Sequence, residues 1–397
     1  MRVAQALVAR FKEREENCRV GVLDCFTRLL AVTVTASDAG VLKFGSPADD
    51  MDDTTASSGA LPAVVDLRTE YAPKLVSSSE KILSVKKGNE RSKSSALALL
   101  ATLCQAPGGV GGQEQIASVF SHVKTFLSNA PRAGSDLVLH REGTSKALRL
   151  DALSLVHAML SSDKHNPVHV RQSLRKALLP ELCMAVKEQW YKVIAAALRA
   201  LAAVPRFFTA LGYDENDDPS LRQKEGAEVA SSLYTAVEPL LSAHDVDQEI
   251  KECALKACAS LLSSLHSCMP VDQQQRLLAL VLDRLKNETT RIIAIKTLSA
   301  IAASSSGSAD GTDMQDGAGE RVNLSPILKE SISTMASFLK YQSRSLKQSS
   351  LEALDIVITN HGSSDPDLAS GELYASVLQE FASLIVDSDL HLSHLSL

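Results

Sequence analysis

Residues 229–265 read VASSLYTAVEPLLSAHDVDQEIKECALKACASLLSSL, and they carry the clearest structural signal in the chain. The first half places apolar residues at i, i+4, i+8 and i+11, the spacing of one helix face: Val229, Leu233, Val237 and Leu240. A polar turn follows at 244–247, and its last residue, Asp247, is suited to cap a second helix. That helix carries its own stripe, formed by Ile250, Ala254, Cys258, Leu261 and Leu265. Neither helix can bury its stripe alone, so the segment predicts a helix pair stacked on other pairs.

The start of the second helix recurs along the chain as a cation followed three and four residues later by a small or apolar pair. In this segment Lys251 precedes Ala254 and Leu255. Further copies, some of them weaker, begin at Arg19, Lys93, Arg149, Lys192, Arg291, Lys347 and His391. The short separations fall within the roughly 40–47 residues of HEAT and armadillo repeats, and the longer ones contain visible insertions. We expect the small residue to permit close helix packing and the cation to sit at the rim with its head in water.

The repeat predicts an all-α fold, a right-handed HEAT/armadillo-type α-solenoid of about eight helix pairs with disordered insertions. It is expected to form one continuous array over residues 1–397. Three stretches with little apolar content are predicted to be flexible insertions, at 36–60, 212–220 and 304–319. The sequence stops at Leu397, inside what should be the second helix of a pair, so we expect a fragment of a longer array.

Composition narrows the class of protein. Charged residues make up 22% of the chain and the net charge is −6, which gives no electrostatic footprint for direct nucleic-acid binding. No apolar run reaches the roughly 18 residues of a membrane span, and no signal peptide is visible. A cytoplasmic or nuclear location without membrane contact is therefore predicted. The seven cysteines mostly fall in apolar helical patterns and are expected to be buried, reduced thiols.

Short motifs with catalytic or ligand-binding potential are weak. The glycine run at 108–112 lacks the preceding strand and the following Gly-Lys-Ser/Thr of a phosphate loop, so it predicts an inter-helix loop. His165 and His169 are four residues apart, but Pro167 between them disfavours the regular helix turn that a metal pair would need. No nucleophile, base and orienting group can be assembled. We therefore predict no enzyme activity, no catalytic residue, no cofactor and no metal.

Charged turns between paired helices are the candidate protein-binding sites. Such turns line one edge of a solenoid, where they either carry partner contacts or are simply solvated. The candidate residues are Arg14, Glu15, Glu16, Asp245, Asp247, Glu249, Lys286, Asn287, Glu288 and Arg291.

Five segments, in this order, resemble the cullin-associated, neddylation-dissociated protein family, the exchange factors of cullin–RING ubiquitin ligases. The segments are 10–17 (RFKEREEN), 150–155 (LDALSL), 245–252 (DVDQEIKE), 283–291 (DRLKNETTR) and 350–356 (SLEALDI). The resemblance covers only the middle portion of the family's length. It implies a long HEAT-repeat protein that wraps an unmodified cullin, covers the lysine that receives the ubiquitin-like modifier and competes with the substrate adaptor. The two ligands of the cullin would then weaken each other reciprocally.

The resemblance implies a protein-binding scaffold that binds unmodified cullins and takes part in assembly and substrate-receptor exchange of SCF-type cullin–RING ligases. Generic HEAT periodicity would suit a nuclear transport receptor or a phosphatase scaffold equally well. A TATA-binding-protein-associated factor is a third alternative, because the family has that association as well, and its role would be protein-mediated. The expected partner is a cullin, and no homo-oligomer is expected.

Overall fold

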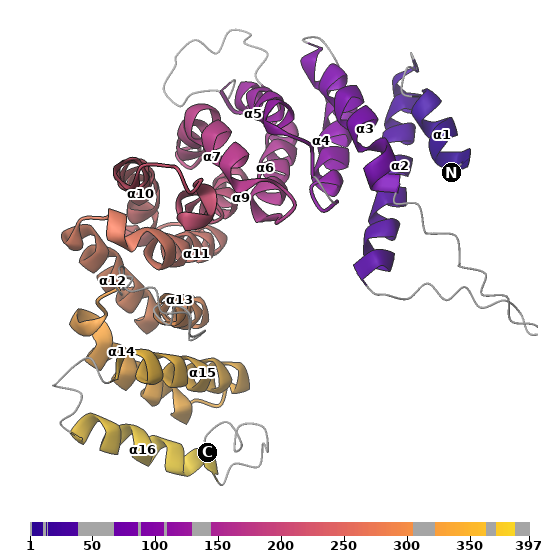
Figure 1. Ribbon diagram of the computed structural model, residues 1–397. Helices are drawn as coiled ribbons and strands as arrows, with labels where there is room; N and C mark the ends of the chain where they lie inside the picture. The colour runs from indigo at the N-terminus through magenta and orange to yellow at the C-terminus, as the bar shows by residue number, and fades with distance from the viewer. Residues whose placement is uncertain are drawn as a thin grey trace, which may run out of the picture. The chain divides into compact units, whose positions relative to one another are not determined.

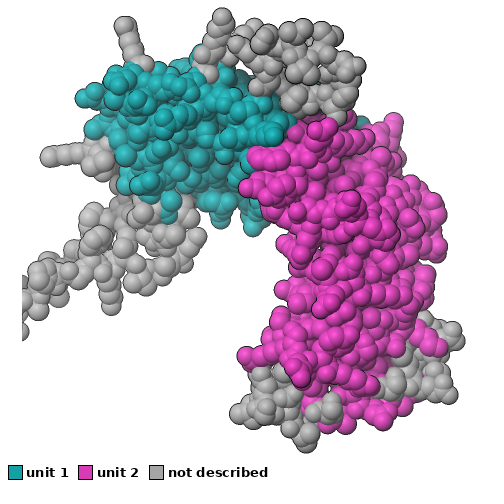
Figure 2. All heavy atoms as spheres, turned by 180° about the vertical axis from the view of Figure 1, so that it is seen from behind, with its two compact units in different colours: residues 1–178 teal, residues 179–397 magenta. Residues whose placement is uncertain are grey.

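The computed structural model describes residues 2–10, 13, 15–38, 67–85, 89–106, 109–128, 144–304, 322–362 and 371–385. Within these ranges every regular element is a helix and there is no strand (Figure 1). Contacts divide the chain into two compact units, residues 1–178 and 179–397 (Figure 2). The prediction of an all-α solenoid is confirmed.

Unit 1 consists of three helix pairs and the start of a further helical segment. Its elements are α1 (Arg2–Ala9), α2 (Glu16–Asp38), α3 (Leu67–Ser84), α4 (Glu90–Leu103), α5 (Gln113–Ser128), α6 (Lys146–Ser161), α7 (Pro167–Ser173) and the π-helical turn η2 (Leu174–Leu178). The second helices α2, α4 and α6 pack in that order, and the first helices α1, α3 and α5 form a parallel row. Each pair therefore buries its apolar stripes against the pair beside it.

Unit 2 continues the same alternation. Its elements are α8 (Leu179–Ala185), α9 (Tyr191–Ala202), η3 (Pro205–Phe208), η4 (Ala210–Gly212), α10 (Pro219–Ser242), α11 (Gln248–Leu265), η5 (His266–Cys268), α12 (Val271–Lys286), α13 (Arg291–Ala303), α14 (Ser325–Ser337), η6 (Phe338–Lys340), α15 (Arg344–His361) and α16 (Glu372–Ile385). Helices α9, α11, α13 and α15 pack in sequence, and α10, α12, α14 and α16 do the same. Successive second helices begin 43 to 57 residues apart, nearer to HEAT and armadillo spacing than to the roughly 34 residues of a TPR unit.

The stripes that predict the α10–α11 pair are buried with one exception. Ile250, Ala254, Cys258, Leu261 and Leu265 all lie in the core of unit 2. On α10, the predicted residues Val229, Leu233 and Val237 are fully buried, whereas Leu240 is only half-buried. The described ranges contain seven helix pairs and the single helix α16, while the expected eighth copy at His391 lies outside them.

The repeated cations are not all at the rim. Arg149 is only 2% exposed and Lys93 only 8% exposed, so the prediction of a solvated head group is wrong for both. The Lys93 Nζ lies 5.6 Å from the ring centroid of Phe126, which belongs to α5. The next helix therefore supplies an aromatic face for the ammonium in place of water. Lys251 is half-buried, and its Nζ donates to the His244 carbonyl at 2.7 Å.

The acidic stretch 212–220, expected to be a flexible insertion, is folded in the structure. Tyr213 is buried and its hydroxyl donates to Glu225 Oε2 at 3.3 Å. Asp218 accepts from the Ser220 amide at 2.9 Å and so caps α10. The stretch therefore forms the turn between η4 and α10, and its flexibility stays a prediction. The insertions 36–60 and 304–319 fall almost entirely outside the described residues, and the single continuous array stays a prediction.

The cysteines are all free, but only some are buried. Cys104, Cys253 and Cys258 lie in the core, whereas Cys18 and Cys25 are exposed on α2. Burial raises the pKa of the Cys258 thiol to about 12. No helix among the described residues has the length and apolar content that crossing a bilayer requires.

Candidate protein-interaction surface

The turn between α10 and α11 is fixed by its own side chains. Asp247 Oδ1 accepts from the Glu249 amide at 2.8 Å, which confirms the predicted cap of α11. Lys251 reaches back from the first turn of that helix to the His244 carbonyl. Asp245, at the tip, is exposed. The turn therefore presents a carboxylate to solvent from a backbone that is tied at both ends.

The turn between α12 and α13 is also fixed by its own side chains, in this case those of an asparagine and two threonines. Asn287 Oδ1 accepts from the amide and the hydroxyl of Thr289, at 3.1 and 2.9 Å. The buried Thr290 hydroxyl donates to the Arg284 carbonyl at 2.9 Å. Glu288 lies at the exposed tip between them. This is an Asx turn, and it leaves one carboxylate facing water.

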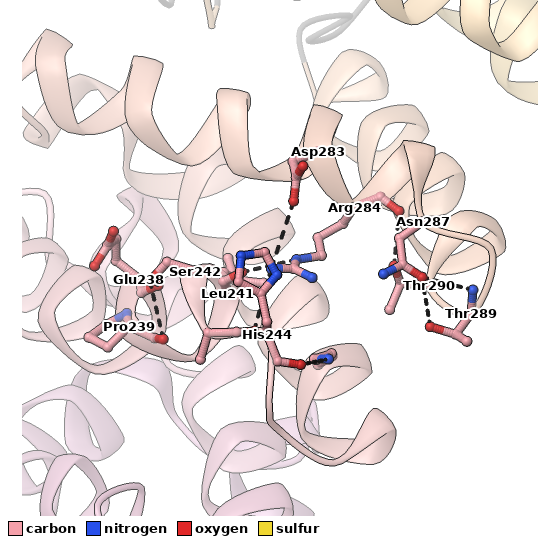
Figure 3. Close-up of polar contacts among 12 residues, drawn as sticks. Glu238, Pro239, Leu241, Ser242, His244, Asp283, Arg284, Asn287, Thr289 and Thr290 are labelled. Atoms are coloured by element: carbon pink, nitrogen blue, oxygen red, sulfur yellow. Dashed lines mark hydrogen bonds and ion pairs between the residues drawn. The ribbon is translucent and has the colours of Figure 1, made fainter.

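Arg284 joins these two neighbouring turns (Figure 3). It extends from α12 and donates from Nε to the Leu241 carbonyl at 3.0 Å and from Nη2 to the Ala243 carbonyl at 3.4 Å. Both carbonyls lie at the end of α10, where backbone acceptors have no partners within the helix. Arg284 is 2% exposed, and the carboxylate of Asp283 lies 3.8 Å from its Nη2. The buried Arg284 guanidinium of α12 thus caps the carboxy-terminal end of α10, which belongs to the preceding helix pair.

Glu16 and Arg291, two of the predicted contact residues, are bound to neighbouring helix pairs. Glu16 accepts hydrogen bonds from the side chains of Asn89 and Ser92, the latter at 3.1 Å. The Arg291 guanidinium lies 4.6 Å from the ring centroid of Phe338 and also faces the ring of Tyr341 at 5.1 Å. These interactions hold consecutive pairs in register.

Two more predicted residues form ion pairs between helix pairs. Glu249 of α11 pairs with Arg199 of α9. Lys286 Nζ of α12 lies 2.6 Å from Glu330 Oε1 of α14. Both ion pairs link neighbouring helix pairs within unit 2, and the role of Glu249 and Lys286 in partner contact stays a prediction.

The remaining predicted residues, Arg14 and Glu15, directly precede α2 in the sequence. Glu15 is exposed, and its carboxylate lies 3.7 Å from the Cys18 sulfur. The negative charge of Glu15 raises the pKa of that thiol. Arg14 lies outside the described residues.

The glycine run forms the inter-helix loop that the sequence predicted, as far as it is described. Gly109 has a φ of 54°, and a Cβ there would lie 2.3 Å from His165 Nε2. The Val110 amide donates to the same nitrogen at 3.2 Å. Burial lowers the pKa of His165 to about 4, so the ring is neutral and can accept this bond. In the described residues no cluster of three potential metal ligands occurs.

Two grooves on unit 1 were not predicted. One, of about 640 Å³, lies between α1, the α1–α2 turn and α3. The other, of about 290 Å³, crosses the second helices α2, α4 and α6 and contains the carboxylates of Asp24, Glu90 and Asp151. Asp151 Oδ2 accepts from Ser94 at 2.5 Å, and Glu90 Oε1 accepts from the Ser145 amide at 3.2 Å.

The sequence is similar to a known family model and to curated proteins from several organisms. A family model described as "CAND1-like, TPR repeats" matches residues 113–258. Cullin-associated NEDD8-dissociated protein 1 of Dictyostelium discoideum is 28% identical over 397 residues, which is all of this chain and 26% of that protein. The protein of the same name from Arabidopsis thaliana is 30% identical over 403 residues, covering 98% of this chain and 27% of that protein. The resemblance expected from the five segments is confirmed.

A solved structure, that of yeast importin-beta, matches the whole chain with a TM-score of 0.57. It covers 41% of that protein at 13% identity, so it shows the fold alone. The chain spans about a quarter of the length of the curated relatives it matches.

Proposed function

We propose that this chain, similar over its whole length to part of the cullin-associated NEDD8-dissociated proteins, is a helical-repeat scaffold that binds an unmodified cullin. In this role it takes part in the assembly of cullin–RING ubiquitin ligases and in the exchange of their substrate receptors. The observation that carries the proposal is the extent of the similarity, which runs across 98 to 100% of the chain. We further propose that it acts by binding and works in the cytoplasm or nucleus.

The turn edge of unit 2 supplies the proposed contacts. Asp245 and Glu288 are exposed at the tips of consecutive turns whose backbones are tied by hydrogen bonds. A rigid pair of carboxylates loses little entropy on binding a basic surface of the partner. The other predicted residues of these turns, Asp247, Asn287 and Lys286, hold the tips in place. Glu15 is the corresponding exposed carboxylate of unit 1.

The experiment measures binding of the full chain to an immobilised, unmodified cullin by biolayer interferometry. D245K/E288K reverses the two exposed turn charges and is expected to weaken binding at least tenfold. E215K/D272K makes the same charge change at exposed positions away from these turns and is the matched control, expected within twofold of the parent. Absence of any binding by the parent chain rejects the cullin assignment. Equal loss in both variants rejects the turn edge as the contact surface.

A further inference from the structure

The larger groove of unit 1 has a floor and walls of distinct chemistry. On α3, Lys74, Ser77, Ser78 and Lys81 follow one another at i, i+3, i+4 and i+7, which places them on one helix face. The two serines are short, so they leave a trough where longer side chains would fill the space. Because the trough opens to solvent, its volume of about 640 Å³ is available to a ligand.

Part of the lining of the trough is apolar. The apolar residues are Val8 of α1, Ile82 of α3 and Val85, which directly follows the end of α3. Val85 is 50% exposed. An apolar partner surface would bury this side chain, which is favourable because it removes apolar surface from water.

The edge of the trough is positively charged. Lys74 and Lys81 are exposed, and Arg19 of α2 is half-buried beside them. Among the described residues that line the groove, the carboxylate is that of Glu13, and its Oε2 lies 3.3 Å from Arg10 Nη1, so a neighbouring cation offsets its charge. The groove therefore combines apolar lining residues with an excess of positive charge.

We propose that this groove binds an amphipathic helix of a partner protein, with apolar residues on one face and glutamate or aspartate on its flanks. Helices of this kind lay their apolar face into a groove through residues at i, i+3, i+4 and i+7. Here the apolar face would contact Val8, Ile82 and Val85, and the acidic flanks would face Lys74 and Lys81. The inference goes beyond the proposed function, because it does not require the partner to be a cullin.

The test uses a synthetic peptide of about 18 residues, long enough to form a helix, with leucine at i, i+3, i+4 and i+7 and glutamate on the flanks. Its fluorescence anisotropy is followed as the full chain is added, and a peptide with lysine in place of every glutamate is the charge control. The glutamate peptide is expected to bind at least tenfold more tightly than the lysine peptide. Its affinity is expected to fall as salt is raised, because exposed charges are screened.

Three variants locate the binding. K74E/K81E reverses the charged edge and is expected to weaken the glutamate peptide at least tenfold. S77F fills the trough without changing charge, and since Ser77 is exposed, the fold should tolerate it and binding should also weaken. K124E/K164E makes the same charge change at exposed positions of unit 1 outside the groove and is expected within twofold of the parent. Circular dichroism confirms that each variant is folded.

Several outcomes would overturn the proposal. The glutamate peptide could fail to bind the parent chain, or bind the groove variants and the parent alike. Vesicles containing phosphatidylserine form the remaining arm. If they sediment with the parent and not with K74E/K81E while the peptide stays free, the groove recognises a lipid surface and the peptide-binding proposal is wrong.

Discussion

Replacing Arg284 with methionine tests how neighbouring helix pairs are fastened together. The substitution removes the guanidinium and keeps much of the apolar stem, so core volume changes little. It leaves the Leu241 and Ala243 carbonyls at the end of α10 without the donor that lies 3.0 and 3.4 Å away. The two carbonyls remain without this hydrogen-bond donor, and this costs free energy that the apolar methionine side chain cannot recover. The cost would be small only if the carbonyl acceptors were removed as well.

The expected loss follows from the geometry. A hydrogen bond to a charged group contributes about 1.5–3 kcal/mol, and the longer bond to Ala243 contributes less. We expect R284M to lower the free energy of unfolding of this region by about 2–4 kcal/mol. At roughly 1.4 kcal/mol for each factor of ten, amide exchange in residues 236–250 should accelerate by about 30- to 700-fold.

The assay is hydrogen–deuterium exchange of the full chain, supported by urea unfolding followed by circular dichroism. Local exchange is the decisive readout, because a repeat array does not unfold in one all-or-none step. R276M is the matched control, since Arg276 also extends from α12 to α10 and its Nε lies 3.2 Å from Glu238 Oε1. Arg276 is 53% exposed, so its ion pair should contribute less than about 1 kcal/mol. Equal exchange rates in R284M and R276M would refute the reasoning.

Three further predictions rest on unit 1. G109A should lower the free energy of unfolding by about 1–3 kcal/mol, because its Cβ would clash with His165, whereas G21A on the open face of α2 should be neutral or slightly stabilising; thermal melts of both variants check this. The pKa of His165 is lowered to about 4 from an ordinary value near 6.5, so its contribution to stability is complete above pH 6.5 and is lost as the pH falls towards 4; urea titrations across this range should show that component in the parent and not in H165Q. E15Q should speed alkylation of Cys18 at pH 8 by removing the charge that raises its pKa, and mass spectrometry should show Cys258 unlabelled in both proteins while they are folded; an unchanged Cys18 rate would contradict the assignment.

The helices and their caps were predictable because their signals are local. The stripe from Ile250 to Leu265 repeats at helical spacing within a single element, and Asp247 directly precedes the helix that it caps. A capped amphipathic segment specifies its own start and its own buried face. The start of such a helix and its buried face can both be predicted without knowing which helix packs against it.

The burial of Lys93 and the role of Arg284 could not be predicted because each depends on a different helix. Lys93 is buried against Phe126 of α5, and Arg284 binds the end of α10. A cation on a helix face reads the same in sequence whether its head meets water, a ring or a carbonyl. The trough beside Ser77 was missed for the same reason, since it exists only between α1 and α3.

The ion pairs of the predicted contact residues contained a usable signal. Lys286 pairs with Glu330 and Glu249 with Arg199, and each partner lies about one repeat length away. Opposite charges at that separation indicate contacts between repeats. The repeat period therefore distinguishes residues that pair between repeats, such as Lys286 and Glu249, from those, such as Asp245, that face solvent.

In unit 2 the helices α9, α11, α13 and α15 lean on one another in a row, and this arrangement governs how far a disturbance can travel. Because each helix contacts only its neighbours in the row, a displacement of one helix shifts the adjacent helices first, and the effect decreases with distance along the row. A ligand that reduces the mobility of α15 would therefore change the mobility of α9 very little. Contacts between neighbouring helices of this row, such as the ion pair of Arg199 on α9 with Glu249 on α11, decide how many of its helices respond together.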